Sequence, residues 1–147
     1  MSLSFRRMGS DDLDTIMQIE QAVYPFPWRR GNFEDSLKSG YSCWVMHQQQ
    51  QLIGYCVIML VVDEAHLLNI SVAKAQQGQG LGRALLEFVQ DTSRQHGANM
   101  LFLEVRESNH SARRLYDRAG FNEMAVRRNY YPAHNGREHA VLMGLNL

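Results

Sequence analysis

The sequence predicts an α/β protein, with a mixed, mostly antiparallel sheet that contains a central parallel pair and carries helices on both faces. Strand-like apolar runs dominate the first half of the chain. A strand–helix–strand unit at 65–105 requires a parallel pair joined by a right-handed crossover. The chain closes on two strand-like runs around a hairpin signal at 132–138, which makes its end antiparallel. We expect a single domain over residues 1–147, because no linker or repeat interrupts the pattern.

Each predicted strand is a short run rich in β-branched, aromatic or other apolar residues. In the run at 99–105, Leu101, Leu103 and Val105 alternate with Met100, Phe102 and Glu104. This strand follows the crossover helix, so we expect it to be central and covered on both faces. The expected strands occupy 3–8, 41–47, 52–62, 65–72, 99–105, 122–131 and 139–147.

The predicted helices are recognised by apolar positions that recur with a helical period and by their end signals. The first is expected to begin at a cap, Ser10 or Asp11, and to stop before the prolines in 24–28. A short helix at 32–39 ends at Gly40, and a long one runs from the glycines to about His96. The last spans 108–120. Its apolar stripe consists of Ala112, Leu115, Tyr116 and Ala119.

A glycine-rich stretch, Gln77-Gly78-Gln79-Gly80-Leu81-Gly82-Arg83, stands directly before the long helix. A helix start leaves about four N–H groups unpaired, and glycines let the backbone approach an anion such as phosphate. Neither the dinucleotide pattern nor the nucleotide P-loop fits, because Arg83 stands in the third glycine slot and no Lys-Ser or Lys-Thr follows. On these residues alone, a phosphate cradle and a plain flexible cap are equally supported.

Three longer stretches resemble one enzyme family. Gln77-x-x-Gly80-x-Gly82 resembles the pyrophosphate motif of the GCN5-related N-acetyltransferase superfamily. The segments LLNISVAKAQQGQGLGRALLE, LEVRESNHSARRLYDRAGF and RRNYYPAHNGREHAVLMGL together resemble its branch of bacterial ribosomal-protein alanine N-acetyltransferases. This resemblance covers nearly the whole chain and implies acetyl-coenzyme A as the cosubstrate. It implies coenzyme contacts at Ile70, Ser71, Val72, Gly78, Gln79, Gly80, Leu81, Gly82, Arg83 and Asn109.

Acetyl transfer requires a base, because most of an α-amine with a pKa of about 7.7–8.0 is protonated near pH 7. Glu104 is the candidate, and the family's proton acceptor falls on it; the alternative is a strand-end carboxylate paired with Arg106. The family's proton donor falls on Tyr116, which is otherwise a structural tyrosine of the helical stripe. A strand amide near Val72 would hold the oxyanion.

The residues themselves say less about which amine accepts the acetyl group than about the coenzyme. The aromatic, proline-stiffened loop at 24–33 and the hairpin at 129–138 could wall a peptide groove, with Tyr130, Tyr131 and Glu138 as contacts. The branch implies that the acceptor is the N-terminal alanine of small-subunit ribosomal protein eighteen. The alternative is an acetyltransferase of the same fold that acts on a small amine or a lysine. His139 departs from the branch's frequent aspartate and Gly78 from a frequently basic residue.

Charge and composition argue against several other classes of protein. The formal net charge is zero, so bulk attraction to nucleic acid or membrane is not predicted. No apolar run reaches the ~20 residues of a membrane helix, and no histidine spacing suits a metal. Cys43 and Cys56 are expected to be buried thiols in a reducing, cytoplasmic compartment. The sequence does not define an oligomeric state.

Overall fold

The computed structural model describes residues 2–147. Within them, seven strands form one sheet in the order β1-β2-β3-β4-β5-β7-β6. The β4 strand (Glu64–Val72) and the β5 strand (Met100–Arg106) are parallel, and the other pairs described are antiparallel. The predicted class, a mostly antiparallel sheet with a central parallel pair and covering helices, is confirmed. The described residues divide into two compact units: unit 1 holds those up to Met59 and Leu68–Val89, and unit 2 holds Leu60–Leu67 and Gln90–Leu147.

Helices cover both faces of the strands in unit 1. The strands β1 (Leu3–Arg7), β2 (Ser42–Gln48) and β3 (Gln51–Val61) pair in sequence order. One face of β2 and β3 packs with the helices α1 (Leu13–Val23) and α2 (Arg30–Lys38), and its core residues include Cys43, Val45, Tyr55 and Val57. Trp44 lies on the other face and meets Phe88 of α3 (Leu81–Gln95) at 5.1 Å between ring centroids. The alternation of β2 therefore separates two helical layers.

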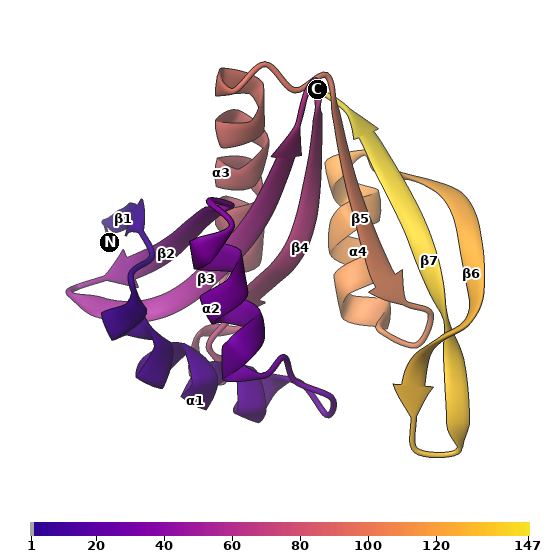
Figure 1. Ribbon diagram of the computed structural model, residues 1–147, viewed down its shortest axis with the longest axis horizontal. Coiled ribbons are helices and arrows are strands. Elements are labelled where there is room, and N and C mark those ends of the chain that lie inside the picture. Colours follow the sequence, from indigo (N-terminus) through magenta and orange to yellow (C-terminus); the bar gives the residue numbers. More distant parts are fainter. Residues whose placement is uncertain (1) are drawn as a thin grey trace. The chain divides into compact units, whose positions relative to one another are not determined.

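Unit 2 contains a long hairpin that extends the sheet. The strands β6 (Asn122–Ala133) and β7 (Gly136–Asn146) run side by side in Figure 1. Residues 140–146 of β7 pair with the whole of β5. The helix α4 (His110–Ala119) ends at Gly120, whose φ of 98° lies in the left-handed region that glycine tolerates. Leu101, Leu103 and Val105 of β5 are buried, as their alternation predicts.

The expected cap of the first helix is wrong. Ser10 and Asp11 belong to a 3₁₀ turn, η1 (Ser10–Asp12), and Asp12 precedes α1. The Asp12 carboxylate accepts a hydrogen bond from the Gly9 N–H at 2.8 Å and pairs with Arg6 at 2.7 Å. These two contacts hold Asp12 outside the helix, so the helical pattern begins three residues later than Ser10.

Candidate active site

The strand β4 turns alternate peptide groups to its two edges. The Ala73 N–H donates to the Ile53 carbonyl of β3 at 2.7 Å, so the peptide groups of Ser71 also face β3. Those of Ile70 and Val72 face the opposite edge. There the Tyr24 hydroxyl donates to the Ile70 carbonyl at 2.6 Å and Gln77 Nε2 donates to the Val72 carbonyl at 3.0 Å. An extended ligand that contains amide groups could hydrogen-bond to β4 along this edge, as an added strand would.

Residues 77–80 of the glycine-rich stretch form an exposed loop between η2 (Lys74–Gln76) and α3, and Leu81, Gly82 and Arg83 are the first residues of that helix. Gly78 and Gly80 both have a φ of 79°, and a Cβ built on either would meet nothing within 4 Å. The glycines are therefore required by backbone conformation, and the space beside them is open. Helical pairing begins where the Ala84 N–H donates to the Gly80 carbonyl, so the amides of the first turn remain for other partners.

Arg83 does not require an anion to explain its position in the first turn of α3. Its Nε lies 3.2 Å from Glu87 Oε1, one helical turn later, and its side chain is 80% exposed. An exposed pair of this kind contributes little to stability. The side chain is consequently free to exchange this partner for a ligand at small cost.

A buried polar cluster in unit 1 was missed by the sequence analysis. Glu20 of α1 is 2% exposed and accepts hydrogen bonds from the Tyr55 hydroxyl at 2.7 Å and the Trp28 N–H at 3.0 Å. Asn69 Nδ2 of β4 lies 3.3 Å from the same carboxylate. Burial, reinforced by the charge of Glu20, raises the pKa of Tyr55, so its hydroxyl stays a donor at neutral pH. A carboxylate four residues after Ile16, on the apolar stripe of α1, was the available signal.

Glu104 lies on β5, on the face opposite Leu103 and Val105. Its partner is Arg127 of β6, whose Nε lies 3.2 Å from Glu104 Oε2. That oxygen is shielded from solvent and accepts no hydrogen bond within residues 2–147, so the contact is one of charge. The ion pair of Glu104 is with Arg127, whereas Arg106 bonds to Glu138 of β7.

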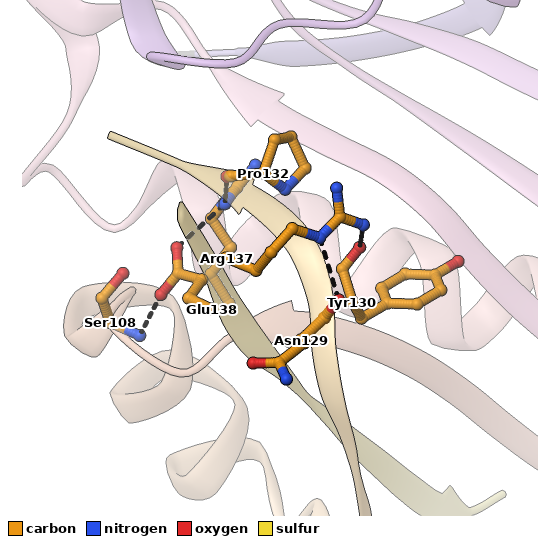
Figure 2. A network of polar contacts seen from close by, with 7 residues as sticks. Ser108, Asn129, Tyr130, Pro132, Arg137 and Glu138 are labelled. Atoms are coloured by element: carbon orange, nitrogen blue, oxygen red, sulfur yellow. Dashed lines mark hydrogen bonds and ion pairs between the residues drawn. The ribbon is translucent and has the colours of Figure 1, made fainter. Parts of the chain in front are cut away.

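Arg106 and Glu138 join four segments of unit 2 in the network of Figure 2. Arg106 Nη1 donates to Glu138 Oε1 at 2.9 Å and to the Pro132 carbonyl at 2.7 Å, and Figure 2 labels both of these acceptor residues. The Arg106 guanidinium also lies 4.5 Å from the centre of the Tyr131 ring. Glu138 Oε2 accepts from the Ser108 N–H at 3.3 Å, before α4. The hydrogen bonds from Ser108 and then Arg106 lower the pKa of Glu138, while burial raises the pKa of Tyr131 to about 12.

His139 has a structural role in the hairpin. Its Nδ1 accepts a hydrogen bond from the Asn129 N–H at 3.0 Å, where Asn129 has a φ of 52° within a bulge of β6. This bond requires an unprotonated Nδ1. The residue that departs from the branch pattern therefore stabilises an irregular turn of backbone between Arg127 and Tyr131.

The remaining candidates belong to α4. Asn109 is its N-cap, and its Oδ1 accepts from the Ala112 N–H at 3.3 Å. Tyr116 is 6% exposed and its ring packs 5.6 Å from that of Phe121, so its predicted inward orientation is confirmed. Glu104, Asn109 and Tyr116 thus lie in unit 2, whereas Ile70–Val72 and Gly78–Arg83 lie in unit 1.

Among residues 2–147, no group of three or more His, Cys, Asp or Glu side chains is arranged to hold a metal ion. No helix in that part of the chain is long and apolar enough to cross a membrane. Cys43 and Cys56 are both buried and unpaired, as expected.

The chain belongs to the acetyltransferase (GNAT) family, which its residues 13–121 match. It is 42% identical over 138 residues to the [ribosomal protein bS18]-alanine N-acetyltransferase of Escherichia coli strain K12, an alignment covering 94% of this chain and 93% of that protein. The enzymatic class, an N-acetyltransferase, follows from this membership.

Solved structures agree with this assignment. The crystal structure of the ribosomal-protein-S18-alanine N-acetyltransferase from Escherichia coli superimposes with a TM-score of 0.92 and 39% identity, covering 99% of this chain and 94% of that one. A putative acetyltransferase from Salmonella typhimurium, solved with its cofactor acetyl-CoA, has the same fold at a TM-score of 0.80 and 21% identity, over 100% of this chain and 95% of its own.

Proposed function

We propose that this chain transfers an acetyl group from acetyl-coenzyme A to the N-terminal α-amine of a protein, and that the acceptor is the N-terminal alanine of small-subunit ribosomal protein eighteen. The observation that carries the proposal is the 42% identity to an enzyme of that name along nearly the full length of both chains. We infer a cytoplasmic location from the same acceptor.

The coenzyme is proposed to bind along unit 1. Its pantetheine amides would pair with β4 at Ile70 and Val72, whose peptide groups lie on the edge of that strand that faces away from β3. Its pyrophosphate would lie on the amides that follow Gly78 and Gly80, where the first turn of α3 leaves N–H groups unpaired. The open space beside both glycines supports this placement. Asn109 would add a contact through its amide nitrogen, since its oxygen already caps α4.

The reaction is proposed to be a direct transfer. Glu104 takes a proton from the acceptor amine, whose nitrogen then forms a bond with the thioester carbonyl carbon. The carbon–sulfur bond breaks, Tyr116 gives its proton to the departing thiolate, and the new amide nitrogen loses its remaining extra proton to solvent. An amide on β4 near Val72 would hold the developing oxyanion. Neither cysteine is suited to a covalent intermediate, since burial raises the pKa of Cys43 to about 11 and that of Cys56 further still.

The acceptor test compares two classes of amine. Purified protein would be incubated with acetyl-coenzyme A and a basic peptide that begins with alanine. Mass spectrometry should locate one acetyl group on the N-terminal nitrogen. The control peptide has the same sequence with a blocked N-terminus and a free internal lysine, and it should remain unmodified. Acetylation of the control, or of a free polyamine at an equal rate, would identify the alternative acceptor class.

The assignment of Glu104 predicts a selective loss of turnover. Glu104→Gln should lower kcat by about 10²–10⁴-fold while coenzyme A affinity, measured by calorimetry, is unchanged, because the amide keeps the shape and loses the basicity. The matched control is Glu107→Gln, an exposed carboxylate three residues further along the chain. Equal turnover in the two variants would remove Glu104 from the mechanism.

A further inference from the structure

The carboxylate of Glu20 is surrounded by hydrogen-bond donors that come from three other segments. Trp28 donates its backbone N–H from the loop after α1, Tyr55 its hydroxyl from β3, and Asn69 its side-chain amide from β4. The proposed chemistry uses none of these groups. A buried ionised side chain is costly unless it is fully hydrogen-bonded, so these donors and Glu20 depend on one another.

The loop is the part of this cluster that depends most on the carboxylate. Residues 24–29 between α1 and α2 adopt neither helix nor strand. The Trp28 N–H of this segment donates to Glu20. The Tyr24 hydroxyl donates to the Ile70 carbonyl and accepts from Ser71 Oγ, both of β4, and the Arg29 N–H donates to Asn32 Oδ1 of α2. Tyr55 and Asn69, by contrast, stand on strands that the backbone ladder also holds. Loss of the carboxylate would therefore loosen the loop at Trp28 before it loosens β3 or β4.

We propose that Glu20 is a positioning residue for the acceptor: it fixes the loop 24–29, as one wall of the peptide groove, against the strand that carries the coenzyme. This inference rests on the proposed function, because it takes the loop to contact the acceptor peptide. The Trp28 ring packs 5.0 Å from Phe33, whose ring lies 5.7 Å from Tyr55. The backbone bond to Glu20 thus also fixes the position of Trp28 in this cluster of aromatic rings.

The test is the isosteric change Glu20→Gln, which keeps the size of the side chain and places an NH₂ group among donors. A hydrogen bond to a charged acceptor is worth about tenfold or more in an equilibrium constant. We expect the KM for the alanine peptide to rise about tenfold, with the Kd for coenzyme A changed less than about twofold. Hydrogen exchange in the segment 24–29, followed by mass spectrometry without any substrate, should become faster.

The matched control is Tyr55→Phe, which removes another hydrogen bond from the same carboxylate and leaves the one to Trp28. It should lower the unfolding midpoint by an amount similar to Glu20→Gln while the peptide KM stays within about twofold of the original. Equal peptide KM values in the two variants would mean that Glu20 acts on stability alone, and would overturn the proposal.

Two outcomes separate this inference from the proposed function. If the unmodified protein does not acetylate the peptide, the proposed function fails, while the exchange measurement still reports on the loop. If Glu104→Gln abolishes turnover and Glu20→Gln changes neither KM nor exchange, the function stands and the role of Glu20 is refuted. Should Glu20→Gln fail to fold, hydrogen exchange of the unmodified protein provides the test. If the Trp28 amide exchanges as fast as an exposed loop amide, the proposal is contradicted.

Discussion

Two arginines of unit 2 each meet a carboxylate and a tyrosine ring on the same face of the sheet. Arg106 bonds to Glu138 and lies over Tyr131, while Arg127 pairs with Glu104 and lies 5.2 Å from the centre of the Tyr130 ring. The planar guanidinium makes both contacts at once, which the ammonium of lysine does poorly. The acidic groups of this face are therefore already neutralised by side chains of the same chain.

The change Arg106→Lys should weaken the network of Figure 2 although it keeps the charge. The shorter ammonium side chain would retain one contact with Glu138 and lose the contact of the guanidinium with the Tyr131 ring. We expect the free energy of unfolding to fall by about 1 kcal/mol, because the pair is only partly exposed, at 19% and 22% for the two side chains. Urea denaturation would measure it. The same change at the exposed Arg128 should be neutral, and a loss as large at Arg128 would contradict the explanation.

For single residues, the sequence predicts the orientation of a candidate side chain better than it predicts the residue with which that side chain pairs. The alternation of β5 predicts which way Glu104 points, because it depends only on neighbouring residues. Its ion pair with Arg127 spans β7 and depends on a register in which Arg127 stands opposite Ala140, just before a bulge. The pattern of a single strand does not define that register, so the sequence offered only the nearer residue, Arg106, as a partner.

At the scale of elements, α4 combines a structural and a proposed chemical role at its first turn. Asn109 caps the helix through its oxygen, which leaves its amide nitrogen for the coenzyme. The two roles can be separated, because aspartate caps a helix as well as asparagine but offers no donor.

Asn109→Asp should therefore leave stability nearly unchanged and weaken coenzyme A binding, since a carboxylate also repels the ligand's phosphates. Asn109→Ala should lower the free energy of unfolding by about 1 kcal/mol, through loss of the cap. Thermal unfolding and calorimetry would measure the two quantities. If coenzyme A binds Asn109→Asp with unchanged affinity, Asn109 caps the helix and does not contact the coenzyme.

The elements themselves were largely predictable, and the exceptions have physical reasons. Periodicity and the glycine at the end of α4 located each strand and helix to within a few residues. The start of α1 was wrong because Asp12 is held by Arg6 of β1, a contact with a different element. Glu20 was overlooked as a site residue because its significance appears only when β3, β4 and the loop after α1 converge on it.

For the whole molecule, the expectation of a single domain over residues 1–147 means that the two compact units should unfold together in one cooperative transition. Each of the two units contains a carboxylate whose pKa is held below its ordinary value: Asp12 in unit 1, by its hydrogen bond with Arg6, and Glu138 in unit 2, by hydrogen bonds from Ser108 and Arg106. These two groups allow acid to be used as a probe of each unit.

A carboxyl group with a lowered folded-state pKa stabilises the protein fully above its unfolded pKa, about 3.9 for Asp and 4.3 for Glu. That contribution is lost as the pH falls through the still lower folded pKa. The unfolding midpoint should therefore drop as the pH is lowered from about 5 toward 3. Asp12→Asn and Glu138→Gln should each lower the midpoint at pH 7 and make the acid drop shallower, because the neutral side chain has no proton to gain.

A single domain predicts that both variants move one common transition in calorimetry, and that the double variant adds their effects, since the two sites share no partner. The calorimetric and van't Hoff enthalpies should then agree in every variant. Acetyl-coenzyme A bound to the native state should raise that same transition. Two transitions, of which one responds only to Asp12→Asn and the other only to Glu138→Gln, would show that the units unfold separately and that the chain contains two domains.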